Sequence, residues 1–88
     1  MTLQDEAINA LLKSALLIKI LKQLAKKPTP TIILSKVLKI STLEAVHMMD
    51  LLKKFDLIER VPGIQIGVYW RLTNKGKYYL EKVGNRSI

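Results

Sequence analysis

The sequence predicts a small α+β domain that is mostly helical, with a two-stranded β-hairpin placed before its last helix. Apolar residues recur at spacings of three and four up to Phe55, which is the period of an amphipathic helix. Between residues 57 and 72 they alternate with polar residues, which is the period of a strand. Helical spacing returns after Thr73, so we expect one more helix behind the hairpin.

The composition favours one globular domain that has an anionic partner. The chain has 88 residues, 49% of them hydrophobic, so it can bury a core. A core of this size is small, and a second copy or a partner would add stability. The net charge is +8, and residues 13–39 contain seven lysines and no acidic residue, whereas acidic residues outnumber basic ones between 40 and 56. The charge therefore lies mainly before the central helix.

Several classes of function are disfavoured by what the sequence lacks. No cysteine is present, which excludes disulfides, thiolate metal sites and a cysteine nucleophile, and fits a cytoplasmic protein. His47 is the sole histidine, so a metal site would need carboxylates alone; we expect no metal and no cofactor. A Gly-rich phosphate loop and a nucleophile with its base are also missing, so we expect no enzyme.

Residues 2 to 27 are expected to form one helix. This stretch has no Gly or Pro, Thr2 can cap it, Asp5 and Glu6 fall in its first turn, and lysines crowd its last turn. Two prolines, at positions 28 and 30, then end the helix. Lysines interrupt the apolar run, so we expect no membrane span, although an amphipathic helix on a membrane surface stays an alternative.

The start of this helix is expected to pair two copies of the chain. We divide the chain into an extension for pairing, 1–13, a globular domain, 14–83, and a flexible tail, 84–88. The apolar side chains of the extension have no obvious partner in so small a core, and two copies around a two-fold axis would cover them. The residues expected at this interface are Leu3, Ala7, Ile8, Leu11, Leu12 and Ala15.

A short helix is expected next, over 32–38. Thr31 can cap it, and Ile33 and Val37, with Leu34, are expected to point inward. A brief turn at 39–40 leads into another helix. Two helices joined by so short a turn form a helix-turn-helix arrangement, although the pattern alone also fits any small helical bundle.

The central helix is expected over 42–55. Ser41 and Glu44 form a capping box that marks its start. Its spacing predicts one buried stripe and one exposed face. The buried stripe is Ala45, Met49 and Leu52, with Met48 beside it, and the exposed face is Thr42, Leu43, Val46, His47 and Asp50.

The hairpin is expected to contain strands 57–61 and 68–72, joined by an uncharged loop at 62–67. Because successive side chains of a strand point to opposite faces, we expect Trp70 to pack inward and Arg71 to point outward.

A last helix is expected over 74–83. Thr73 can cap it and Gly84 can end it. The candidates for packing against the core are Tyr78, Tyr79, Leu80 and Val83.

From Ser14 to Val83 the order of elements resembles the winged-helix domains of small prokaryotic transcription regulators. Asp56-Leu57-Ile58-Glu59-Arg60 is similar to the G-L-I-x-R entry to the wing, and Arg71-Leu72-Thr73-Asn74-Lys75-Gly76 is similar to the R-L-T-x-K-G exit into the final helix. Asp56 replaces the usual Gly, and Asp tolerates the left-handed conformation needed there. The lysine-rich first helix and the lack of cysteine resemble small proteins of archaea and their viruses.

The resemblance implies that helix 42–55 enters the major groove of DNA and that the wing, 58–72, contacts the backbone or the minor groove. The residues expected to reach bases are Thr42, Glu44 and His47. Those expected to contact the backbone are Lys36, Lys39, Lys53, Lys54, Arg60, Arg71 and Lys75. Leu43 and Val46 offer only methyl contacts, and Asp50 repels phosphate.

The leading hypothesis is a homodimeric DNA-binding protein that regulates transcription and has double-stranded DNA as its partner. The alternative is a winged-helix module for protein–protein interaction, without specific DNA reading, that uses the Leu43 and Val46 face or the N-terminal helix. A third possibility is a protein that coats DNA without regard to its sequence.

Overall fold

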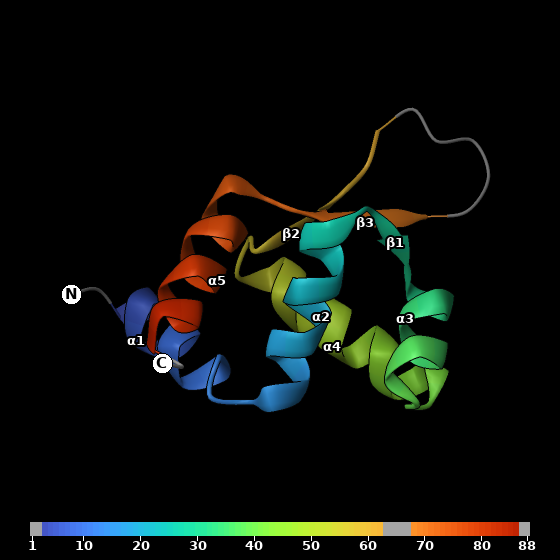
Figure 1. The fold of residues 1–88 in the computed structure, drawn as a ribbon, viewed down its shortest axis with the longest axis horizontal. Coiled ribbons are helices and arrows are strands. Elements are labelled where there is room, and N and C mark those ends of the chain that lie inside the picture. The colour runs from blue at the N-terminus through green and yellow to red at the C-terminus, as the bar shows by residue number, and fades with distance from the viewer. Residues whose placement is uncertain (1–2, 63–67, 87–88) are drawn as a thin grey trace.

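The computed structural model of the chain describes residues 3–62 and 68–86. Helices α1 and α5 lie together at one end, α2 and α4 occupy the middle, and α3 lies at the other end below the hairpin (Figure 1). The elements in chain order are α1 (Leu3–Leu11), α2 (Ala15–Lys26), β1 (Thr29–Pro30), α3 (Thr31–Leu38), α4 (Thr42–Lys54), β2 (Ile58–Arg60), β3 (Tyr69–Leu72) and α5 (Asn74–Arg86).

The hairpin strands belong to an antiparallel sheet of order β1-β3-β2. The predicted strands are confirmed but shorter than expected, and β1 was not predicted. Thr29 pairs with Trp70 and Pro30 with Tyr69. A strand of two residues has no periodicity to detect, and its proline is tolerated because β1 is an edge strand. The expected loop at 62–67 lies outside the described residues, apart from Pro62.

The single helix expected over 2–27 is wrong, because the chain turns between α1 and α2. Ser14 caps α2: its hydroxyl oxygen accepts a hydrogen bond from the backbone N–H of Leu17 at 3.4 Å. A serine that satisfies a free N–H in this way favours a helix start over a helix interior. The expected Thr2 cap lies outside the described residues.

The turn folds α1 back onto the domain. Ile8 is 0% exposed and Leu12 is 4% exposed, and both belong to the same hydrophobic core as α2, α4 and α5. Leu11 packs against that core in part. The expectation that these side chains lack a partner within one chain is therefore wrong, and Ile8 and Leu12 are not free to face a second copy.

A polar contact also ties α1 to α5. The hydroxyl of buried Tyr79 donates a hydrogen bond to the carboxylate of Asp5. This bond and then burial raise the pKa of Tyr79 to about 12. The phenol therefore stays protonated and keeps donating at neutral pH, which fixes the two helices against each other.

Helix α3 presents a different face from the one expected. Ile33 and Val37 are 40% and 54% exposed, whereas Leu34 and Ser35 are buried. Thr31 is the first residue of the helix and does not cap it; its hydroxyl instead accepts a hydrogen bond from the indole N–H of Trp70 at 3.1 Å. The pairing of β1 with β3 brings Thr31 and Trp70 together. Which face of α3 points to the core is therefore decided by a contact between residues that are distant in sequence.

The end of α4 confirms the role expected of Asp56. Its φ is 61°, and its N–H donates to the carbonyl of Lys53 at 2.9 Å. The N–H of Leu57 donates to the carbonyl of Leu52 at 3.0 Å, which completes a Schellman cap. Helix α5 starts as predicted, with Thr73 accepting from the N–H of Gly76 at 2.9 Å. It continues through Gly84, so the expected stop there is wrong.

Candidate nucleic-acid interface

Helix α4 is held by its N-terminal cap and by the turn from α3. The hydroxyl of Ser41 accepts from the N–H of Glu44 at 3.0 Å, as predicted. Lys39 ends α3 in the left-handed conformation, with φ 57°, and the N–H of Ile40 donates to the carbonyl of Ser35 at 3.0 Å. Because the N–H groups of Lys39 and Ile40 both bond back to the end of α3, this turn fixes the direction in which α4 starts.

The predicted division of α4 into two faces is confirmed. The stripe that enters the core is Ala45, Met49 and Leu52, and the exposed residues include Thr42, Leu43, Glu44, Val46, His47 and Asp50. The three residues expected to reach bases do not share one side. At 3.6 residues per turn, about 160° separates Thr42 from Glu44, and about 60° separates Glu44 from His47. Thr42 lies with Val46 instead, about 40° away.

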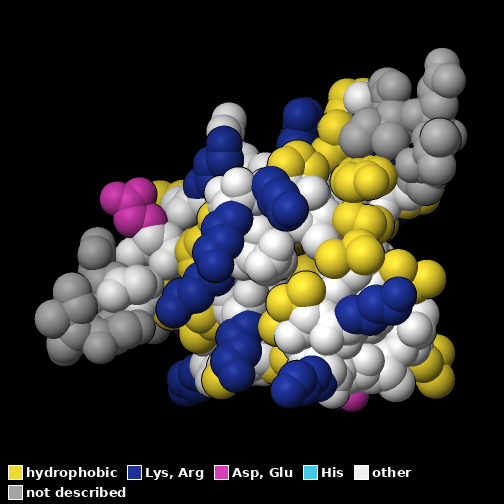
Figure 2. All heavy atoms as spheres, turned by 45° about the vertical axis from the view of Figure 1, so that its right-hand side comes forward, with side chains coloured by type: hydrophobic (Ala, Val, Ile, Leu, Met, Phe, Trp, Pro, Cys, Tyr) yellow, Lys and Arg dark blue, Asp and Glu magenta, His cyan; other side chains and the backbone are white. Residues whose placement is uncertain are grey.

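A groove opens beside Thr42 and Val46. Its volume is about 410 Å³, and its lining comes from the start of α4, the start of α3 and the start of β3. The lining residues are Pro30, Thr31, Ile32, Thr42, Val46 and Val68. Figure 2 shows hydrophobic side chains gathered below the hairpin, with Lys and Arg side chains around them.

Ile32 and Val68 line the groove although the sequence did not predict them as site residues. Ile32 is 55% exposed and Val68 is 37% exposed, although isoleucine and valine are usually buried in a core. Their exposure follows from the rotation of α3 and from the pairing of β1 with β3. No local signal in the sequence reports either feature.

Trp70 links the groove to the basic residues of α4 and the wing. Its indole N–H binds Thr31, and the Nζ atom of Lys53 lies 5.7 Å from the centre of its ring. Arg60 lies opposite Trp70 in the sheet register, so the two side chains share one face of the sheet. Trp70 is half-buried and packs in part against the core, in agreement with the inward prediction, and Lys53 and Arg60 are each a neighbour of Trp70.

Arg60 and Arg71, both predicted to contact the DNA backbone, do not lie on the same face of the sheet. In the sheet register, Arg71 pairs with Glu59 and Arg60 pairs with Trp70, and these two pairs are adjacent along the strands. Because successive strand residues alternate, the two arginines point to opposite faces of the sheet. Arg71 Nε also donates to a carboxylate oxygen of Glu59 at 2.9 Å, and both side chains are 45% exposed.

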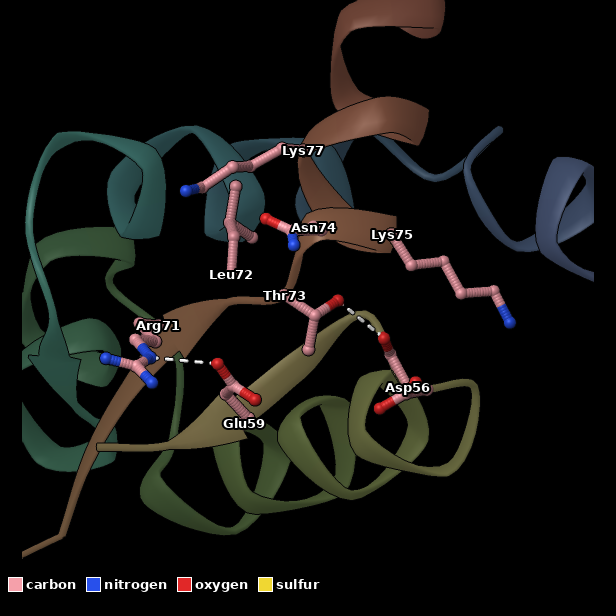
Figure 3. Close-up of a pocket in the computed structure, with 8 residues that line it drawn as sticks. All are labelled: Asp56, Glu59, Arg71, Leu72, Thr73, Asn74, Lys75 and Lys77. Atoms are coloured by element: carbon pink, nitrogen blue, oxygen red, sulfur yellow. Dashed lines mark hydrogen bonds and ion pairs between the residues drawn. The ribbon is translucent and has the colours of Figure 1, made fainter. Parts of the chain in front are cut away.

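The face that carries Arg71 forms a second, polar pocket of about 490 Å³. Figure 3 shows that its residues come from the end of α4, the sheet and the first turn of α5, with Arg71 and Glu59 facing each other and the Lys75 side chain extending away from them. Its cationic side chains are Arg71, Lys75 and Lys77, and its carboxylates are Asp56 and Glu59. The pocket therefore carries charges of both signs.

The remaining predicted backbone contacts lie at the surface. Lys36 and Lys39 are exposed at the end of α3, Lys53 and Lys54 are exposed at the end of α4, and Lys75 is half-buried. Their contacts with DNA stay predictions. Across residues 3–62 and 68–86, no cluster of three or more acidic or histidine side chains is placed to hold a metal ion. Within the same ranges, no helix has the length and apolar character needed to cross a membrane.

No family model and no curated protein sequence matches the chain. Solved structures do match it. The winged helix-turn-helix DNA-binding domain of a possible ArsR-family transcriptional regulator from Mycobacterium bovis, described as homodimeric, has a TM-score of 0.82 at 16% identity over 96% of this chain and 78% of that one. RV1404 from Mycobacterium tuberculosis has a TM-score of 0.75 at 21% identity, over 82% and 51%.

ZitR from Lactococcus lactis, in complex with DNA, matches with a TM-score of 0.71 at 23% identity, over 77% of this chain and 48% of that one. The chain thus spans about half the length of ZitR. Together these matches confirm a mostly helical winged helix-turn-helix fold. The neighbours named here are bacterial, so they give no support to the resemblance to archaeal proteins.

Proposed function

We propose that this chain is a DNA-binding protein that regulates transcription, with α4 in the major groove and the hairpin beside the phosphate backbone. One observation carries the proposal: Trp70 has a cation from α4 and a cation from the wing as neighbours, because the Lys53 amine lies 5.7 Å from the centre of its ring and Arg60 lies opposite it in the sheet register. Two cations beside an exposed, capped helix are suited to holding that helix against a duplex. The fold is shared with ZitR, which has been solved with DNA.

In this proposal, individual residues have different tasks. Glu44 and His47 reach bases from one side of α4, and Thr42 reaches them from the other. The residues proposed to hold phosphates are Lys36, Lys39, Lys53, Lys54, Arg60, Arg71 and Lys75. Arg71 is the weakest of these, because Glu59 already neutralises part of its charge.

A protein–protein interaction module is the second candidate. Leu43 is 67% exposed on α4, and Glu44 and Asp50 on the same helix repel phosphate. Such a module would bind duplex DNA weakly even at low salt. A titration of mixed-sequence duplex at low and moderate salt separates the candidates, because absence of binding at low salt overturns the DNA-binding proposal.

Arg60→Gln is expected to flatten the salt dependence of DNA binding. Each phosphate contact contributes about −0.9 to the slope of log K against log salt, so losing one contact should make the slope shallower by about that amount. The slope is measured by titrating one fluorescent duplex at a series of salt concentrations.

Lys19→Gln is the matched control for Arg60→Gln. It removes the same charge from an exposed residue of α2 that is neither a proposed phosphate contact nor part of the proposed dimer patch. If both substitutions changed the slope equally, the change would be due to the net charge of the protein. That result would mean that the wing does not contact DNA.

We also propose that the chain is a homodimer that pairs through the exposed side of α1. Leu3 is 85% exposed and Ala7 is exposed on that helix, and Tyr78 is 59% exposed on α5, which packs beside it. A patch of this kind favours pairing around a two-fold axis. A dimer would present two α4 helices to half-sites about 34 Å apart.

Leu3→Glu combined with Ala7→Glu is expected to yield a folded monomer with weaker DNA binding, because charge at the patch opposes its burial. Leu43→Glu introduces a single glutamate at an exposed leucine of α4, outside the proposed patch, and should leave the dimer intact. Sedimentation of the wild type, the double variant and Leu43→Glu measures the oligomeric state of each. A wild-type chain that sediments as a monomer at micromolar concentration would overturn the pairing.

A further inference from the structure

We infer that the groove beside Thr42 and Val46 receives the C5-methyl groups of thymines, so that the chain reads thymine in the major groove by apolar contact. This inference rests on the proposed function, since it requires α4 to lie in the groove of a duplex. It names the feature of DNA that α4 recognises, and it adds Ile32, Val46 and Val68 as residues that determine specificity.

The chemistry of the groove is that of a methyl receptor. Ile32, Val46 and Val68 are 55%, 40% and 37% exposed and contribute branched aliphatic carbons. Thr42 adds a methyl group next to a hydroxyl. None of the described residues that line the groove is charged. Thymine is the base that presents a methyl group in the major groove, and side chains of this kind are its usual contacts.

The charges around the groove fit the rest of a duplex. Lys36 lies one turn along α3 from Ile32, and Lys53 lies two turns along α4 from Val46, so each lysine shares the side of its helix with a groove residue. The rise from Val46 to Lys53 is about 10 Å, close to the width of about 12 Å of the major groove. The apolar groove would therefore contact thymine methyl groups, while Lys36 and Lys53 would contact the phosphates on either side of them.

The same charges disfavour the other occupants of an apolar groove. A second copy of the chain would bring its own net charge of +8 toward Lys36 and Lys53. An apolar segment of another protein would gain nothing from those lysines unless it were acidic at both edges. Thymine-bearing DNA supplies the apolar centre and the anionic edges together.

The test compares two duplexes of one A·T-rich sequence, one with thymine and one with deoxyuridine at every thymine position. The phosphates and the hydrogen-bonding edges are the same, and the methyl group alone is removed. We expect wild-type affinity to fall about fourfold for each methyl group buried in the groove. A G·C duplex should gain affinity when its cytosines carry the same methyl group at C5.

Two groove variants and one matched control locate the effect. Val46→Ser and Ile32→Ser should bring the thymine-to-uracil affinity ratio close to one while leaving binding to the uracil duplex unchanged. A general loss of structure would instead lower both affinities. Val37→Ser makes the same change at a residue of α3 that is 54% exposed and does not line the groove, so it should keep the wild-type ratio.

The outcomes separate this inference from the proposed function. Equal binding of both duplexes by the wild type overturns the methyl contact and leaves DNA binding in place. Failure to bind either duplex at low salt overturns the proposed function, and the inference with it. If Val46→Ser altered the oligomeric state without DNA and left the affinity ratio unchanged, the groove would be an interface between copies, which also overturns the inference.

Discussion

Gly76→Ala is expected to destabilise the fold by about 3 kcal/mol, because the added methyl group has no room. A Cβ atom at this position would overlap the carbonyl oxygen of Leu57 and lie 3.1 Å from its carbonyl carbon. That carbonyl cannot move away freely. It accepts the N–H of Thr73 at 3.1 Å, and the N–H of Leu57 is bound to the cap of α4.

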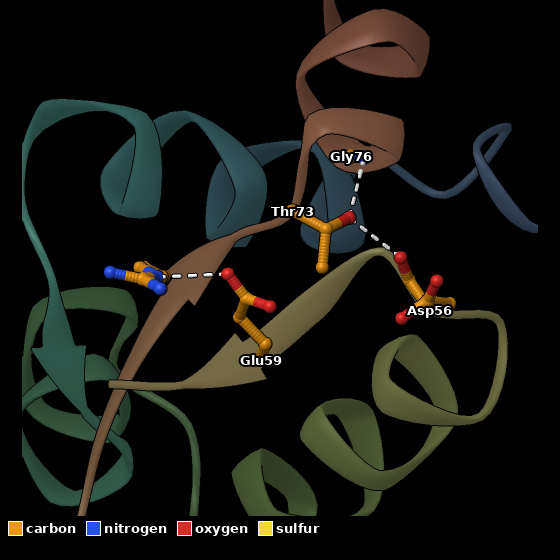
Figure 4. A network of polar contacts seen from close by, with 5 residues as sticks. Asp56, Glu59, Thr73 and Gly76 are labelled. Carbon is orange, nitrogen blue, oxygen red and sulfur yellow. Dashed lines mark hydrogen bonds and ion pairs between the residues drawn. The ribbon is translucent and has the colours of Figure 1, made fainter. Parts of the chain in front are cut away.

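Thr73 stiffens the same junction from the other side. Its hydroxyl donates to the carbonyl of Asp56 at 2.6 Å and accepts from the N–H of Gly76 at 2.9 Å. Figure 4 shows these bonds joining the end of α4, the sheet and the start of α5. A substitution at Gly76 therefore disturbs three elements at once, and the wing that they support.

Gly84→Ala is the control on the same helix. Apart from the adjacent residues and the backbone of its own helix, no described atom lies within 4 Å of a Cβ added there, so the change should be neutral or stabilise the protein by up to about 1 kcal/mol through helix propensity. Urea unfolding followed by circular dichroism measures both variants. Similar free energies of unfolding for the two would show that the close approach of Gly76 to Leu57 does not exist.

Local signals account for the parts of the fold that could be predicted. The caps at Ser41 and Thr73 and the left-handed Asp56 each depend on side chains and backbone groups within a few residues, and all three are confirmed. The resemblance of residues 71–76 to the winged-helix pattern also has a physical basis here. Its threonine bonds the end of α4, and its glycine permits the close approach to Leu57.

Contacts between distant residues account for the parts that could not be predicted. Strand β1 exists through its pairing with β3, and that pairing turns α3 so that Ile32 lines the groove while Leu34 enters the core. The sheet register likewise sends Arg60 and Arg71 to opposite faces. Periodicity within one segment carries no information about either, which is why the sequence predicted the buried and exposed faces of α4 but not the lining of the groove or the relative orientation of the two arginines.

Ile8→Ala is expected to lower the free energy of unfolding by about 3 kcal/mol, a typical cost for truncating a fully buried aliphatic side chain. Ile8 is 0% exposed and packs in the common core, so its loss would leave a cavity between α1 and the rest of the domain. Leu3→Ala, on the same helix, removes a side chain that is 85% exposed and should change stability by less than about 0.5 kcal/mol in the monomer.

Chemical denaturation at low protein concentration, where pairing contributes least, measures the two variants. A small effect of Ile8→Ala would mean that the domain does not need α1 for its stability, in agreement with the predicted division at residue 13. A large effect makes α1 part of the folding unit. In that case Ile8→Glu would bury an unpaired charge and unfold the chain, so it would not report on pairing. Pairing therefore has to be tested at the exposed residues Leu3 and Ala7.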